Sequence, residues 1–197
     1  MNYLAHARLS FGDPHLLIGN LISDFVKGTA QYRYPIAVQK GIRLHRAIDT
    51  FTDEHAAVKE IKSIFQQDYG RYAGAFADVS MDYFLANDEQ EFSDENVLHQ
   101  FVIETHQHLE NSIELLPENF HPVFSSMKQH FWLFHFRNTA GMEKSFKNLV
   151  KRAKYLEESE RAFLLFIQHE HSIRMLYQDF FPEVKKFSMK HISENML

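Results

Sequence analysis

The sequence predicts one all-α domain, a bundle of roughly eight helices. Apolar residues recur with the period of a helix along nearly the whole chain, and glycine and proline are scarce inside the periodic segments. No alternating run of β-branched residues occurs, which argues against a sheet. The length of 197 residues suits a single domain, and no internal repeat or low-complexity linker divides it. Residues 1–197 are therefore expected to fold as one unit.

The first helices are bounded by caps and prolines. After the short segment LAH, Asp13 suits an N-cap and Pro14 suits a first helical position. The sequence therefore predicts a helix from about Pro14 to Lys27 that stops at the following glycine. Residues 28–35, GTAQYRYP, are typical of a loop, and the next helix is expected over residues 36–53.

The boundary after this second long helix stays open. Thr52 and Asp53 suit both a break in one helix and a new N-cap for a helix over residues 54–67. Further along, Ser93 or Asp94 suits the cap of a long amphipathic helix. The remaining helices are predicted over residues 75–88, 92–116, 125–136, 141–156 and 159–191.

The composition narrows the kinds of site and partner. The chain has no cysteine, which excludes disulfides and thiolate metal sites. A metal would be held by nitrogen and oxygen, a ligand set that favours Mn, Mg, Fe or Zn. The net charge of −5 argues against general nucleic-acid binding. No signal peptide and no apolar run of about 20 residues is evident, so we expect a soluble, cytoplasmic protein without a membrane partner.

Polar residues recur at four-residue spacing on otherwise apolar helices. Residues four apart lie on the same face of a helix, so each pair projects two side chains in one direction. His6, near the N-terminus, is placed to complete a shared centre. The pairs are Asn20 and Asp24, His45 and Asp49, and Asp78 and Asp82.

A purely structural interpretation competes with a metal site. In the structural interpretation, His45 and Asp49 form one ion pair on a solvated helix face. Asp78 and Asp82 are then buried carboxylates that form salt bridges with Arg43 or Arg46. Two carboxylates on an apolar helix repel unless a cation lies between them. Three such helices indicate a shared polar centre, which a divalent metal and a hydrolytic water would supply. Phosphate-ester hydrolysis is therefore the chemistry that we expect.

At these same residues the chain resembles the acyl carrier protein phosphodiesterase family, also called acyl carrier protein hydrolase. The matching stretches are MNYLAH, GNLISDFVKG, GIRLHRAIDTFTD and DVSMDYFL, and FWLFHFRNTAGMEKSFKNLVKRAK is also similar. The resemblance implies hydrolysis of the phosphodiester that joins 4′-phosphopantetheine to a serine of holo acyl carrier protein. It also implies manganese dependence and an all-helical fold like that of the HD-type metal phosphohydrolases.

The resemblance further implies roles for residues in the matching stretches. Mn²⁺ is the implied cofactor, with Mg²⁺ or Fe²⁺ as other divalent ions. No His-Asp dipeptide occurs in the chain, so an HD-type site would use a rearranged set of ligands. The implied catalytic residues are Asp24, His45, Arg46, Asn20 and Asp78. The implied metal ligands are His6, Asp24, His45, Asp49 and Asp82, and residues among these that do not bind metal would orient those that do.

The implied partner is holo acyl carrier protein. Acyl carrier proteins are acidic and this chain is net acidic too, so charge complementarity would have to be local. Two basic stretches suit that role, and for each a solubilising charged face is the alternative. The stretches are Lys27, Arg33, Lys40 and Arg43, and Lys144, Lys147, Lys151, Arg152 and Lys154.

Two other functions stay open at this stage. A metal phosphohydrolase that acts on a nucleotide or another small phosphoester would need the same site. A non-enzymatic helical module that binds a partner would use the polar residues only as buried ion pairs, and it predicts no bound metal and no loss of stability on adding a chelator. The sequence does not predict the oligomeric state.

Overall fold

The computed structural model describes residues 2–195, and these residues form only helices and their connections. The prediction of an all-α fold is confirmed. The described residues contain ten α-helices and four 3-10 helices. The α-helices are α1 (Tyr3–Arg8), α2 (Pro14–Ile22), α3 (Ile36–Glu54), α4 (Ala56–Tyr69), α5 (Ala73–Ala86), α6 (Glu95–Glu110), α7 (His121–Gln129), α8 (Trp132–His135), α9 (Thr139–Arg152) and α10 (Glu160–Asn195). The 3-10 helices are η1 (Ser23–Phe25), η2 (Gly28–Arg33), η3 (Gly70–Tyr72) and η4 (Ile113–Leu115).

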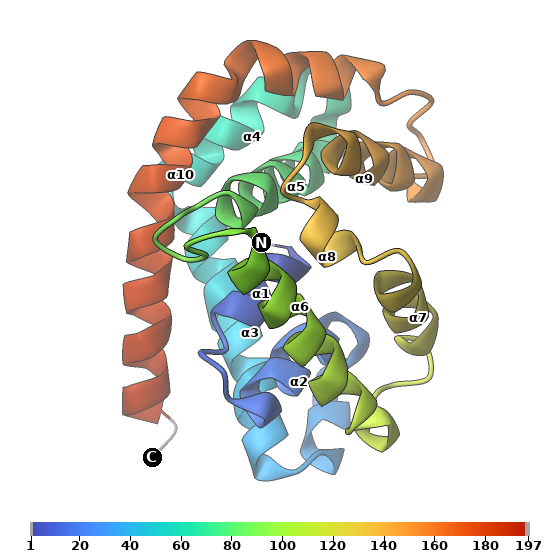
Figure 1. Cartoon of the computed structure of the whole chain (residues 1–197), viewed down its shortest axis with the longest axis vertical. Helices are drawn as coiled ribbons and strands as arrows, with labels where there is room; N and C mark the ends of the chain where they lie inside the picture. The colour runs from blue at the N-terminus through green and yellow to red at the C-terminus, as the bar shows by residue number, and fades with distance from the viewer. Residues whose placement is uncertain (1, 196–197) are drawn as a thin grey trace.

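Helix α10 extends along one whole side of the molecule and bends over α4 near its start (Figure 1). It packs on α3, α4 and α5, while α2 packs against α3 and α1 lies against α2 and α5. Helices α7 and α8 lie on the opposite side, α6 crosses in front of α1 and α2, and α9 packs on α5 (Figure 1). None of the described helices combines the length and the apolar character needed to span a membrane.

Phenylalanine dominates the core, as the 19 phenylalanines in the sequence suggest. Phe65 of α4, Phe76 of α5 and Phe146 of α9 are fully buried and meet with ring centroids 5.0–6.2 Å apart. On α3, the ring of Phe51 stacks on that of Phe187 of α10, with centroids 4.7 Å apart. Such contacts fix the long C-terminal helix to the helices that carry the polar pairs.

The start of α2 matches the prediction, but its end does not. Asp13 accepts hydrogen bonds from His15 N and Leu16 N, each at 2.9 Å, as an N-cap should. The helix ends at Ile22 rather than Lys27, and the chain continues through η1 to an extended backbone at the buried Val26. Residues 28–33 then form η2 where a loop was expected.

Two other boundaries differ from the sequence-based expectation. Helix α3 continues through Thr52 and Asp53, and His55 caps α4 by accepting a hydrogen bond from Ala57 N. The helix expected over residues 125–136 is divided into α7 and α8, because Phe131 adopts the left-handed conformation with φ +46°. Its ring packs beside histidines of α6. This division accounts for part of the difference between ten helices and the predicted eight.

Helices α2 and α3 cross at two glycines. A Cβ atom on Gly19 would lie 2.1 Å from the Val38 carbonyl oxygen, and one on Gly41 would lie 2.4 Å from the Leu16 carbonyl oxygen. Any larger residue at either position would therefore collide with the backbone of the other helix. This close crossing brings Asn20, next to Gly19, within reach of His45 on α3.

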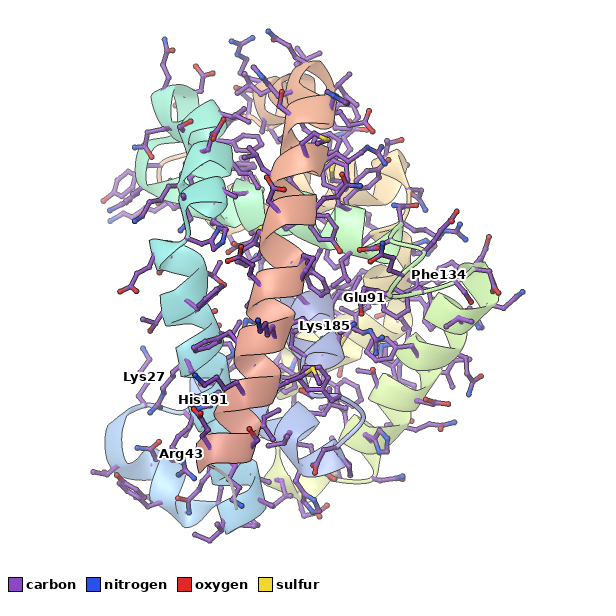
Figure 2. All side chains as sticks on the ribbon, turned by 90° about the vertical axis from the view of Figure 1, so that its left-hand side faces the viewer. Lys27, Arg43, Glu91, Phe134, Lys185 and His191 are labelled. Atoms are coloured by element: carbon purple, nitrogen blue, oxygen red, sulfur yellow. The ribbon has the colours of Figure 1, made fainter. Side chains whose placement is uncertain are left out.

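The buried carboxylate of Glu91 joins the first and last helices. It accepts a hydrogen bond from Arg8 Nε of α1 at 2.9 Å and from Lys185 Nζ of α10 at 2.5 Å. Figure 2 shows Lys185 on α10 and Glu91 beside this helix. The Glu91 side chain is only 6% exposed, so the two cations are needed to compensate its charge.

Candidate metal centre

Three side chains from two helices converge on one site. His6 of α1, together with His45 and Asp49 of α3, offers three ligand atoms that all lie within 4.8 Å of one another. Asp49 Oδ1 lies 3.2 Å from His6 Nε2, and Asp49 Oδ2 lies 3.1 Å from His45 Nε2. The two imidazole rings stack with centroids 4.1 Å apart. We call these three residues the His-His-Asp cluster.

Asn20 of α2 fixes the orientation of both rings. Its Nδ2 donates to the His6 carbonyl oxygen at 2.8 Å, so its Oδ1 is the atom that accepts from His6 Nδ1 at 2.7 Å. Its backbone carbonyl accepts from His45 Nδ1, also at 2.7 Å. Each ring therefore carries its Nδ1 proton toward Asn20 and presents Nε2 to the cluster. Metal-binding histidines are held in this way in proteins.

The donor set suits a divalent cation. The Nε2 atom of His6 is buried and makes no hydrogen bond among the described residues, although a carboxylate oxygen lies close to it. With Nδ1 already protonated, the neutral ring directs a lone pair at an anion, which is unfavourable unless a cation lies between them. Two imidazole nitrogens and a carboxylate are common ligands of Mn²⁺, Fe²⁺ and Zn²⁺.

His6, His45 and Asp49 change one another's pKa values. Burial and the neighbouring His45 lower the pKa of His6 to about 4. Burial also opposes charge on His45, but hydrogen bonds to Asp24 and Asp49 outweigh it and raise the pKa of His45 to about 9. The two histidines in turn hold the pKa of Asp49 far below its usual range despite burial. Without a metal, His45 is therefore the histidine of the cluster that is positively charged at neutral pH, while His6 is neutral.

Asp24 stands at the solvent edge of the cluster. Its Oδ1 lies 3.3 Å from His45 Nε2, and its side chain is 73% exposed, compared with 39% for Asp49 and 3% for His6. The bond to His45 keeps the pKa of Asp24 below its usual value. Asp24 is thus the carboxylate that a molecule from solvent meets first.

One predicted ligand, Asp82, and one predicted catalytic residue, Asp78, lie outside the His-His-Asp cluster. Both carboxylate oxygens of the fully buried Asp82 accept backbone N–H groups of α1, from Leu4 at 3.1 Å and Ala5 at 3.2 Å. Asp82 therefore caps the helix that carries His6. Asp78, one turn earlier on α5, also stays outside the cluster, and burial raises its pKa. Asp82 thus serves the first helix rather than the cluster.

Replacing Asp82 with asparagine should lower the free energy of unfolding of the metal-free protein by about 1–3 kcal/mol. An amide offers one oxygen where two N–H groups now bond to the carboxylate, so one buried donor loses its partner. Urea denaturation in the presence of a chelator measures this effect. If the variant instead keeps its metal-free stability and loses metal binding, Asp82 acts as a ligand.

Arg46, predicted to bind phosphate, holds the segment after Asp24. Its Nη1 donates to Gln31 Oε1 at 2.9 Å and its Nη2 donates to the Val26 carbonyl oxygen at 3.1 Å. The guanidinium therefore fastens η2 to α3, one residue after His45. Its remaining N–H groups stay on the exposed side of the helix.

Aromatic side chains beside the cluster were not predicted. Tyr3 lies one turn before His6 on α1, and its ring meets Trp132 of α8 edge-on at 5.4 Å. Burial raises the pKa of Tyr3 to about 12, and the charge of Asp24 adds to this effect while that of Arg152 opposes it. The three-residue spacing of tyrosine and histidine in MNYLAH is the signal that would have placed Tyr3 on the same face.

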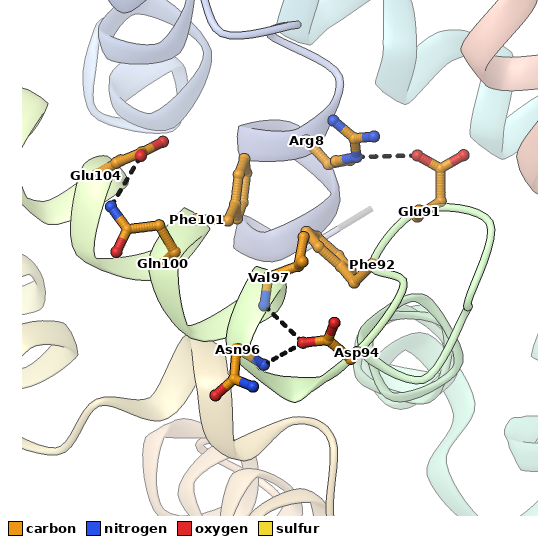
Figure 3. A pocket seen from close by; sticks show the side chains of 9 residues that line it. All are labelled: Arg8, Glu91, Phe92, Asp94, Asn96, Val97, Gln100, Phe101 and Glu104. Carbon is orange, nitrogen blue, oxygen red and sulfur yellow. Dashed lines mark hydrogen bonds and ion pairs between the residues drawn. The ribbon is translucent and has the colours of Figure 1, made fainter.

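A separate surface hollow of about 440 Å³ lies beyond Arg8. Figure 3 shows Phe92 and Phe101 along it, with Arg8 bonded to Glu91 at its edge. None of the residues of the His-His-Asp cluster lines this hollow. The hollow and the cluster are therefore distinct features.

Comparisons with known proteins point to one family. A family model described as acyl carrier protein phosphodiesterase matches residues 1–184. A protein of that name from Photorhabdus laumondii is 29% identical over 182 residues, which cover 92% of each chain. One from Klebsiella pneumoniae (strain 342) is 36% identical over 132 residues, 67% of this chain and 66% of the relative. One from Escherichia coli O139:H28 is 26% identical over 184 residues, 93% of this chain and 95% of the relative. No solved structure matches the chain.

Proposed function

This chain belongs to the acyl carrier protein phosphodiesterase family, and from that membership we propose its reaction. The protein is a phosphodiester hydrolase that releases 4′-phosphopantetheine from holo acyl carrier protein. The phosphorus–oxygen bond to the serine is broken by water, and the serine hydroxyl of the apo protein is restored. The chain covers nearly the full length of several relatives with this name, which supports the same substrate.

The His-His-Asp cluster is the observation that carries the chemistry. A phosphodiester is inert in water unless its charge is neutralised and its nucleophile is activated. His6, His45 and Asp49 would hold one divalent ion, and Mn²⁺ is the ion that we propose. A bound ion of this kind supplies Lewis-acid stabilisation of a phosphoryl oxygen and lowers the pKa of water.

The remaining residues act around this centre. Asn20 keeps both Nε2 atoms available, as its hydrogen bonds to the two rings support. Asp24, exposed and bonded to His45, is placed to accept a proton from the attacking water. The N–H groups of Arg46 that do not bond Val26 and Gln31 are placed to stabilise negative charge on the phosphate. Asp82 supports the site from α5 by bonding the first turn of α1, and Asp78, one turn earlier on α5, is the proposed further residue that positions phosphate or water.

Two broader properties belong to the same proposal. The arrangement is of the HD-phosphohydrolase type with rearranged ligands, in which His45 and Asp49 on one face of α3 replace a His-Asp dipeptide. The enzyme acts in the cytoplasm, where its carrier-protein substrate serves fatty acid biosynthesis.

The test is mass spectrometry of holo acyl carrier protein after incubation with the protein, with and without Mn²⁺. The expected result is metal-dependent loss of the phosphopantetheine mass, with no loss in matched reactions with His45→Ala or Asp24→Ala protein that is folded by circular dichroism. If the carrier protein stays intact while Mn²⁺ binds, the substrate is another phosphoester, and a screen of small phosphodiesters follows. Full hydrolysis by either variant would show that the site lies elsewhere.

A further inference from the structure

The hydroxyl group of Tyr3 lies beside the candidate metal centre without a hydrogen-bond partner. Tyr3 is one turn before His6 on α1, so both side chains leave the helix on one face. Its ring is partly buried, yet its hydroxyl bonds none of residues 2–195. A tyrosine hydroxyl in such a place usually has a partner. The Tyr3 hydroxyl is therefore available to a molecule that reaches the centre from solvent.

Aromatic contacts hold the Tyr3 ring next to the segment that carries Asp24. The ring lies 6.4 Å from that of Phe120, which is fully buried, and it meets Trp132 edge-on at 5.4 Å. Phe120 also meets Phe25, the residue after Asp24, with centroids 5.2 Å apart. One buried ring thus packs against both α1 and η1. Tyr3 cannot turn away from this segment without losing these contacts.

Arg152, the last residue of α9, is a cation without an ion pair among the described residues. Its exposed side chain donates only through Nε, to the Asn148 carbonyl oxygen of its own helix at 3.3 Å. Its two terminal nitrogens bond none of residues 2–195. Arg46 differs, because its Nη1 and Nη2 already bond Gln31 and Val26. Arg152 therefore keeps the fork of donors that suits a phosphate group.

The charges of Asp24 and Arg152 both act on the Tyr3 hydroxyl. Burial raises the pKa of Tyr3 to about 12, the charge of Asp24 adds to this rise, and that of Arg152 opposes it. The hydroxyl therefore keeps its proton at neutral pH and can donate it in a hydrogen bond. The packing agrees with this arrangement, since α8, which carries Trp132, contacts α9 as well (Figure 1). A carboxylate, a hydroxyl donor and a guanidinium thus come together at the solvent edge of the His-His-Asp cluster.

The proposed substrate has a group that needs such donors. A phosphodiester carries one negative charge, shared by two non-bridging oxygens, and Asp24 by itself would repel it. The His-His-Asp cluster would bring a divalent ion to one of these oxygens, which leaves the other without a partner. Resting on the proposed function, we propose that this second oxygen binds between the Tyr3 hydroxyl and the Arg152 guanidinium.

The two groups have different tasks at that oxygen. Arg152 supplies a full positive charge, which offsets Asp24 and the charge that develops as the bond to serine breaks. Tyr3 supplies one directed hydrogen bond from a ring that is held in place. Neither group recognises what is esterified to the phosphate. The pair therefore serves the phosphodiester itself, and its effect is measurable with inorganic phosphate as well as with holo acyl carrier protein.

Phosphate affinity is the first test, because it needs no turnover. Inorganic phosphate titrated into Mn²⁺-loaded protein should bind about 10–100-fold more weakly to Arg152→Gln than to the parent. Lys151→Gln removes the same charge from the preceding residue, which is exposed and is not among the groups that shift the pKa of Tyr3, and it should bind phosphate within about 2-fold of the parent. Arg152→Lys should recover part of the loss. Mn²⁺ affinity and melting temperature should stay unchanged in all three variants.

Turnover of holo acyl carrier protein completes the test. Tyr3→Phe keeps the ring and loses only the hydroxyl, so it should lower kcat/KM by about 10-fold, and Arg152→Gln should lower it by about 10–100-fold. If the parent hydrolyses the carrier protein and both variants match it, the phosphate site is wrong and the reaction stands. If Arg152→Gln loses phosphate affinity but the parent leaves the carrier protein intact, the reaction is wrong and the site stands. Phosphate that does not bind the parent, or that binds Lys151→Gln as weakly as Arg152→Gln, would also overturn the site.

Discussion

An Asp49→Asn protein is expected to bind Mn²⁺ at least about 100-fold more weakly than the parent and to lose nearly all hydrolysis. Asp49 is the one residue of the cluster that contacts both histidines, through Oδ1 to His6 and Oδ2 to His45. Changing it to an amide keeps the shape and removes the charge that a divalent ion requires. Isothermal titration with Mn²⁺ measures the affinity.

The melting temperature gives a second, independent measure of Mn²⁺ binding in the Asp49→Asn protein. Saturating Mn²⁺ should raise the melting temperature of the parent, because the ion binds only the folded chain, and should raise that of Asp49→Asn much less. Asp53→Asn is the matched control, since Asp53 lies one turn further along α3 and pairs with Lys62 instead. Equal Mn²⁺ affinity in the parent and in Asp49→Asn would show that the His-His-Asp cluster is an ion-pair network that does not bind the metal.

A Gly19→Ala protein is expected to lose about 3 kcal/mol or more of its free energy of unfolding. The added Cβ would stand 2.1 Å from the Val38 carbonyl oxygen and 2.8 Å from Gly41 Cα, and both are backbone atoms that cannot rotate away. Helices α2 and α3 must then separate. Because the Asn20 carbonyl holds His45 across this crossing, Mn²⁺ affinity should also fall.

Urea denaturation of Gly19→Ala beside Gly74→Ala tests this packing. Gly74 lies in the first turn of α5, and a Cβ there would meet only the flexible end of Lys62 at 3.5 Å. The usual preference of helices for alanine should therefore make that control neutral or more stable by up to about 1 kcal/mol. Equal urea midpoints for the two variants would show that α2 and α3 move apart without a loss in the free energy of unfolding.

The sequence predicts more of the fold than of the site. Helical periodicity and the Asp13 cap indicate where most helices lie, because these signals act within one or two turns. The early end of α2 and the division at Phe131 are not local: they depend on the Val26 contact with Arg46 and on packing beside α6. Such tertiary interactions override the preference of a short segment.

For the site, four-residue spacing shows which side chains share a face but not what that face meets. His6, His45 and Asp49 were among the predicted ligands, and the structure brings these three together. The same spacing on α5 also predicted Asp82 as a ligand, whereas its oxygens bond the first turn of α1. Only the positions of α1 and α5 distinguish these outcomes, so the metal-binding roles stay a prediction.

The bond network of Glu91 has a consequence for how the protein is made. Arg8 leaves the ribosome 177 residues before Lys185, yet both bond the same buried carboxylate. At about 5–20 residues per second, the helix that carries His6 is made roughly 9–35 s before Lys185 is available to bond Glu91. The support of His6 is therefore complete only after α10 has been made, so a truncation that removes Lys185 should disturb α1.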